Sequence, residues 1–132
     1  SVSTAARIES KCKEYGCVLL IGQNTYERTK DDFFYLKIDD LAVKGKTVGI
    51  GIWTVLDDPK PAWKTTRRYH EDMHRAYKAQ KFDEAIWIAQ KIENHFDGKM
   101  KGYYTMWIER CEYMMTQDLP KDWNGVFIAT TK

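Results

Sequence analysis

The chain has 132 residues, 43% of them hydrophobic, which is enough for one domain with a buried core. Its 21 basic and 19 acidic residues leave a formal net charge of +2, so overall charge does not point to nucleic acid or an anionic membrane surface as a partner. No apolar run is longer than five residues, as in CVLLI at residues 17–21, which is far shorter than the roughly 20 residues of a transmembrane helix. Cys12, Cys17 and Cys111 form no CxxC pair, so we expect a soluble domain whose cysteines are buried and reduced.

The first half of the chain predicts a layer of helices and strands. Apolar residues recur at helical spacing over residues 4–15, and a glycine follows where helices often end. The apolar run CVLLIG at residues 17–22 predicts a buried strand, and a short polar helix is expected over residues 23–30. Aromatic and β-branched residues predict two strands at 33–43 and 49–55, joined by the polar KGKT turn of a hairpin. This order of elements favours an α/β fold class.

The second half predicts mainly helices. The stretch DDPKPAW, at residues 57–63, holds two of the three prolines and ends the strand signals. Apolar residues three and four apart then predict amphipathic helices over residues 63–79, 82–94 and 103–115. The first two, with their short connection, resemble one tetratricopeptide-type hairpin. Residues 126–129 are expected to form a last strand or to pack as an extended arm.

Three short motifs stand in the first half of the chain: VSTAARIES at residues 2–10, TYE at 25–27 and VKGK at 43–46. In this order and at this spacing they resemble the C-terminal part of the class III nucleotidyl cyclase catalytic domain. The tail DWNGVFIATTK resembles that of bacterial cyclases that carry an extracytoplasmic sensor and membrane helices upstream. The resemblance implies an α/β (α+β) remnant of a cyclase domain over residues 1–56, followed by an all-helical, tetratricopeptide-like extension over residues 57–132.

The resemblance also implies a set of site residues. Cyclisation of a nucleoside triphosphate builds negative charge on phosphoryl oxygens, which a fixed cationic donor stabilises. By position in the family pattern, Arg7 is that donor, and Lys44 and Lys46 bind the substrate phosphates. Ser3 stands at a catalytic position that holds asparagine in the family, four residues from Arg7 and hence on the same helix face. The serine leaves two readings open, a cyclase that tolerates it and a weak or degenerate one.

The function implied by the resemblance is the formation of cyclic AMP or cyclic GMP and pyrophosphate from ATP or GTP. In the family, the ligands of Mg²⁺ or Mn²⁺ and the lysine that reads the purine precede the first helix of this chain, so we expect the fragment alone to be inactive. The family builds its sites across a dimer interface, which implies a homodimer that binds a nucleoside triphosphate. The resemblance places the chain in the cytoplasm, as part of an inner-membrane protein whose membrane segments lie upstream, with no nucleic-acid partner.

Two alternatives come from the second half. HEDMH, at residues 70–74, matches the H-E-x-x-H signature of zinc metallopeptidases, in which two histidines bind zinc and the glutamate is the general base. Glu93 or His95 on the next helix would supply a third ligand, although no peptidase-type sheet precedes the motif. Two polar histidines on a helix surface are an equal alternative. The other alternative is a helical protein-interaction or dimerisation module on a degenerate cyclase scaffold.

Overall fold

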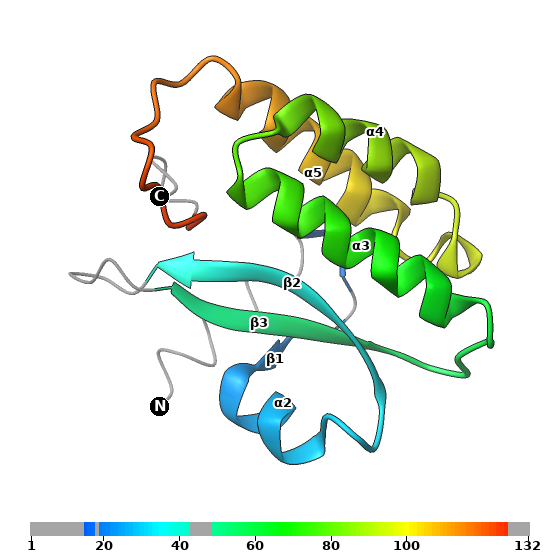
Figure 1. Ribbon diagram of the computed structural model, residues 1–132. Coiled ribbons are helices and arrows are strands. Elements are labelled where there is room, and N and C mark those ends of the chain that lie inside the picture. Colours follow the sequence, from blue (N-terminus) through cyan, green and yellow to red (C-terminus); the bar gives the residue numbers. More distant parts are fainter. Residues whose placement is uncertain (1–14, 18, 43–48, 127–132) are drawn as a thin grey trace.

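The computed structural model describes residues 15–17, 19–42 and 49–126, and within these ranges the chain forms a mixed α+β fold. Three strands form one sheet: β1 at Ile21–Gly22, β2 at Phe34–Ala42 and β3 at Gly49–Leu56. Strand β3 lies between the other two, and both strand pairs are antiparallel (Figure 1). The α+β class is therefore confirmed, while the description of this part as a cyclase remnant stays a prediction.

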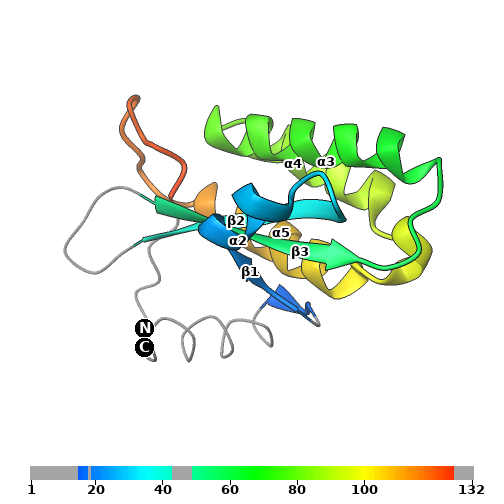
Figure 2. The same ribbon diagram turned by 90° about the horizontal axis from the view of Figure 1, so that it is seen from below.

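Helices lie on both faces of the sheet. The short helix α2, at Gln23–Thr29, lies on one face (Figures 1 and 2). The other face carries α3 at Trp63–Lys78, α4 at Phe82–Ile92, the 3-10 turn η1 at Phe96–Gly98 and α5 at Lys101–Met114. Each of the three long helices begins and ends within two residues of its predicted bounds, and α4 contacts both α3 and α5. The likeness of the α3–α4 pair to a tetratricopeptide hairpin stays a prediction.

The apolar run at residues 17–22 is not the buried strand that its composition predicts. Of the described residues 17 and 19–22, only Ile21 and Gly22 pair with β3, and the Leu19 side chain is 46% exposed. The Thr54 hydroxyl of β3 donates a hydrogen bond to the Leu19 carbonyl oxygen at 2.7 Å. If β1 extended to Leu19, that carbonyl would instead accept from a backbone N–H of β3. The prediction was wrong because apolar composition does not reveal how far a neighbouring strand can pair.

Some expected features lie outside the described residues. These are residues 4–14 of the first predicted helix, the KGKT turn and residues 127–129 of the tail. Among the helices that the structure does describe, none combines the length and the apolar character needed to cross a membrane.

A bulge in β2 decides which side chains reach the helical layer. The pairing register shifts between Lys37 and Asp39, so Ile38 stands opposite no residue of β3. Neighbouring residues of a regular strand point to opposite faces, but Ile38 and Asp39 are 0% and 3% exposed and both lie against the helices. The extra residue therefore brings the Asp39 carboxylate into the core.

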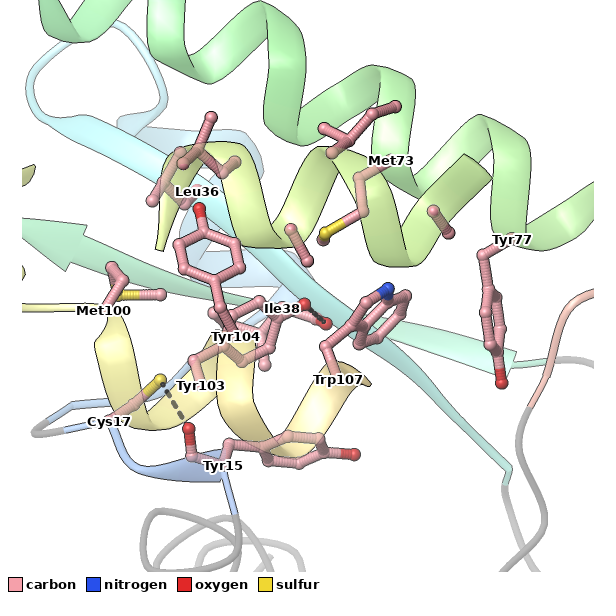
Figure 3. Packing of buried hydrophobic residues seen from close by; sticks show 14 of the residues in the cluster. Tyr15, Cys17, Leu36, Ile38, Met73, Tyr77, Met100, Tyr103, Tyr104 and Trp107 are labelled. Carbon is pink, nitrogen blue, oxygen red and sulfur yellow. Dashed lines mark hydrogen bonds between the residues drawn. The ribbon is translucent and has the colours of Figure 1, made fainter. Parts of the chain in front are cut away.

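One hydrophobic core lies between the sheet and helices α3, α4 and α5. Figure 3 shows Ile38 of β2, Met73 of α3 and Trp107 of α5 in this layer. Cys17 and Cys111 are buried in it, as expected, whereas Cys12 lies outside the described residues. The core thus connects the two predicted parts of the chain, and the domain boundary at residue 57 stays a prediction.

Candidate functional site

The four residues expected to act on a nucleotide, Ser3, Arg7, Lys44 and Lys46, lie outside the described residues. Their roles therefore stay predictions. The described parts of the same motifs are helix α2, which carries TYE, and strands β2 and β3, which flank VKGK. Ala42 at the end of β2 pairs with Gly49 at the start of β3. The connection that carries both lysines therefore joins two directly paired residues of neighbouring strands.

Aromatic stacking fixes helix α2 to the sheet. The ring of Tyr26, the central residue of TYE, stacks on Trp53 of β3 with centroids 3.9 Å apart and 3° between the planes. The Gln23 side-chain oxygen accepts a hydrogen bond from the backbone N–H of Gly51 at 3.2 Å. A Cβ atom on Gly51 would lie 2.5 Å from the Trp53 ring, so only glycine allows this close packing. The tyrosine of the motif thus attaches α2 to β3.

The first histidine of HEDMH, His70, links helix α3 to β2 and α5. Its Nε2 lies 2.6 Å from the Lys37 carbonyl oxygen, and its Nδ1 lies 2.8 Å from the Tyr104 hydroxyl. Because a carbonyl only accepts, we assign the proton to Nε2, and Nδ1 accepts from Tyr104. Burial lowers the pKa of His70 to about 4, although the bond to Lys37 opposes that shift. The ring is therefore neutral at pH 7.

The second histidine, His74, lies next to a tyrosine hydroxyl that is bonded to the next backbone carbonyl of the bulge. Its Nε2 lies 3.1 Å from the Tyr103 hydroxyl, which donates to the Ile38 carbonyl oxygen at 2.6 Å. Desolvation lowers the pKa of His74, and the positive charges of Lys37 and Lys78 lower it further. Two consecutive backbone carbonyls at the bulge are thus held by side chains of the helical layer.

These contacts give no support to the zinc-peptidase alternative, which stays a prediction. Both ring nitrogens of His70 already lie within hydrogen-bonding distance of protein groups. One of the two candidate third ligands, His95, places its Nδ1 3.1 Å from the Thr66 hydroxyl. Within residues 15–17, 19–42 and 49–126, no three histidine, cysteine, aspartate or glutamate side chains come together as a metal site. We interpret the H-E-x-x-H match as two histidines that hold α3 to β2 and α5.

A buried ion pair between Asp39 and Arg110 was not foreseen from the sequence. Arg110 Nη1 donates to an Asp39 carboxylate oxygen at 2.5 Å, and the Tyr15 hydroxyl donates to the same oxygen at 2.7 Å. The two charged side chains are each 4% exposed. The available signals were the pair of aspartates inside an apolar strand and an arginine beside the apolar residues of a helix.

Electrostatics favour the charged form of the Arg110 guanidinium. Burial alone would lower the pKa of Arg110, but the Asp39 carboxylate raises it above its ordinary value. Burial raises the pKa of the Tyr15 hydroxyl, and the negative charge of Asp39 raises it further, so Tyr15 remains a donor. The cluster ties β2 and α5 to the segment before β1.

The aromatic residues of the helices mostly pack in the core. Trp63, Tyr77, Tyr103, Tyr104 and Trp107 are buried, while Trp87 on α4 is 60% exposed. The helical interaction module stays a prediction.

Comparison with known proteins yields one informative likeness. No protein-family model matches the chain, and no solved structure matches it significantly. The chain is 29% identical over 93 residues to a protein of Dictyostelium discoideum described as "Adenylate cyclase, terminal-differentiation specific". That match covers 65% of this chain but 4% of the relative, so the chain corresponds to a small part of a much longer protein. The likeness suggests a domain related to cyclases.

Proposed function

We propose that this chain is the C-terminal part of a nucleotidyl cyclase catalytic domain, in a protein that forms a cyclic nucleotide and pyrophosphate from a nucleoside triphosphate. The similarity to the Dictyostelium adenylate cyclase carries the proposal. The order of VSTAARIES, TYE and VKGK supports it independently. A location in the cytoplasmic part of a bacterial inner-membrane protein belongs to the same proposal and rests on the resemblance of the tail.

The proposed chemistry gives each predicted residue a task. The ribose 3′-hydroxyl releases its proton to solvent and attacks the α-phosphorus, the bond to the β-phosphate oxygen breaks, and pyrophosphate leaves with that electron pair. Arg7 donates hydrogen bonds to the phosphoryl oxygens, where charge develops, and its planar guanidinium suits them. Ser3 orients the ribose through its hydroxyl, directly or through a water molecule. Lys44 and Lys46 neutralise the terminal phosphates that depart.

The proposed site needs residues beyond this chain. The described residues bring together no group that fits a divalent metal ion, and the resemblance assigns the metal ligands to the segment upstream. Magnesium or manganese would supply Lewis-acid stabilisation of the phosphates when bound. In the proposal the metal ligands and Arg7 come from different subunits of a homodimer, so neither subunit has a complete site alone.

Cyclase activity of the longer protein that contains this chain tests the proposal. The assay supplies Mn²⁺ with either ATP or GTP and compares the wild type with Arg7→Ala. Loss of one donor to the transition-state charge is expected to lower kcat by about 100-fold or more. The matched control is Arg28→Ala, which removes an exposed arginine from α2 and should change kcat by less than about twofold.

The outcomes separate the possibilities. Cyclic product that depends on Arg7 but not on Arg28 supports the assignment and shows that Ser3 is tolerated. A folded dimer that forms no cyclic nucleotide from ATP or GTP contradicts the proposed activity. The degenerate scaffold with a helical interaction module would then be the better hypothesis.

A further inference from the structure

A hollow lined by cationic side chains opens between helices α2 and α3, beside β2. It has a volume of about 440 Å³. Figure 1 shows α2 and α3 on opposite sides of β2, which is an outer strand of the described sheet. The lining holds five cations against two carboxylates, Asp31 and Glu71; we call it the basic hollow, and its cations are Lys30, Lys37, Lys64, Arg67 and Arg68.

Most of these cations have no protein counter-charge. Lys37 forms an ion pair with Asp40 at 3.0 Å, and the Arg67 guanidinium lies 4.5 Å from the centroid of the Phe34 ring. The other three cations form no ion pair within the part of the chain that the structure describes, and they are exposed: Lys30, Lys64 and Arg68. Like charges gathered around one hollow repel each other, and a bound anion would relieve that repulsion.

Three lining residues of the basic hollow are held by contacts within the protein. Tyr26 stacks on Trp53, and His70 Nε2 is held by the Lys37 carbonyl oxygen. Besides Lys37 of β2, the cations come from two separate regions: Lys30 directly follows α2, while Lys64, Arg67 and Arg68 belong to the first two turns of α3. An anion in the hollow would therefore be approached by donors from both sides without refolding of either region.

We propose that the basic hollow binds a small molecule that carries two or more phosphate groups. Its volume lies within the range of about 300–1,000 Å³ that is usual for small-molecule sites. The excess of three positive charges suits a ligand with two or three negative charges, and arginine and lysine are the side chains that proteins use for phosphate. The ligand joins the segment after α2 to helix α3, which links the predicted cyclase-like part to the helical extension.

Binding of inorganic pyrophosphate, measured by titration calorimetry on the full chain, tests this inference. We expect saturable binding to one site. The double variant Lys64→Gln/Arg68→Gln and the single variant Lys30→Gln should weaken it by about tenfold or more, because each removes charge-assisted hydrogen bonds. The matched control Lys101→Gln/Lys121→Gln removes two exposed lysines outside the hollow and should change the affinity by less than about twofold. Far-UV circular dichroism verifies that each variant is folded.

Other results would overturn the inference. Equal weakening in the control means diffuse attraction to a charged surface, and sulfate binding as tight as pyrophosphate means that phosphate is not selected. Tighter binding of a single-stranded oligonucleotide than of pyrophosphate would assign the hollow to a nucleic-acid surface. Binding that is lost in Arg7→Ala but kept in the hollow variants would belong to the proposed cyclase site, so the two proposals fail separately.

Discussion

Acid is expected to destabilise this fold through His70. The neutral ring donates from Nε2 to the Lys37 carbonyl oxygen at 2.6 Å and accepts at Nδ1 from the Tyr104 hydroxyl at 2.8 Å. Protonation adds a hydrogen to Nδ1, so that this nitrogen becomes a donor facing the Tyr104 donor. It also puts a positive charge into a side chain that is 1% exposed. Neither change is costly in the unfolded chain, where the ring is hydrated.

The magnitude follows from the two pKa values of His70, about 4 in the folded state and 6.5 in the unfolded state. As the pH falls, the unfolded state takes up the proton first, so this contribution to stability is complete above pH 6.5 and is lost toward pH 4. Between pH 7 and pH 5 the free energy of unfolding should fall by about 2 kcal/mol from this group, and by about 3 kcal/mol at pH 4.

Urea denaturation at pH 7, 6 and 5, followed by circular dichroism, measures the effect. The wild type is compared with His70→Gln, whose amide can still donate to the Lys37 carbonyl but does not titrate. Part of the acid sensitivity comes from other groups, so the informative quantity is the difference between the two pH slopes.

Equal pH slopes for the wild type and His70→Gln would refute this reasoning, because the buried ring would then contribute nothing to acid sensitivity.

Two further predictions concern the core and the sheet. Arg110→Met should lower the free energy of unfolding by about 3–5 kcal/mol, because it leaves the Asp39 carboxylate buried and unpaired. The double variant with Asp39→Asn should lose less than the sum of the single losses in chemical denaturation; additive losses would contradict a direct pair. Gly51→Ala should cost about 1–3 kcal/mol, since its Cβ would lie 2.5 Å from the Trp53 ring. In Gly102→Ala the Cβ meets no atom nearer than 3.7 Å, so the helix should gain up to about 1 kcal/mol; similar shifts of Tm in both glycine variants would contradict this contrast.

Local patterns along the chain predicted most of the elements. The three- and four-residue spacing of apolar side chains placed α3, α4 and α5 to within two residues, because a helix buries one face wherever it packs. Aromatic and β-branched residues placed β2 and β3 in the same way. The similarity of three motifs suggested the cyclase relation, which agrees with the Dictyostelium match, although the residues predicted to react lie outside the described structure.

The roles of particular polar residues followed only from contacts between distant segments. Asp39 and Arg110 are 71 positions apart, and the bulge that turns Asp39 inward depends on how β2 pairs with β3. HEDMH has the same residues and spacing whether it binds zinc or holds a strand, and the groups around His70 that decide the matter belong to β2 and α5.

The sequence by itself therefore determined most of the segments that form helices and strands, because those preferences depend on neighbours along the chain. The tertiary structure alone decided which strand edges pair, which charges are buried and what each histidine contacts. Those properties depend on the register and packing of segments that meet only after the chain has folded.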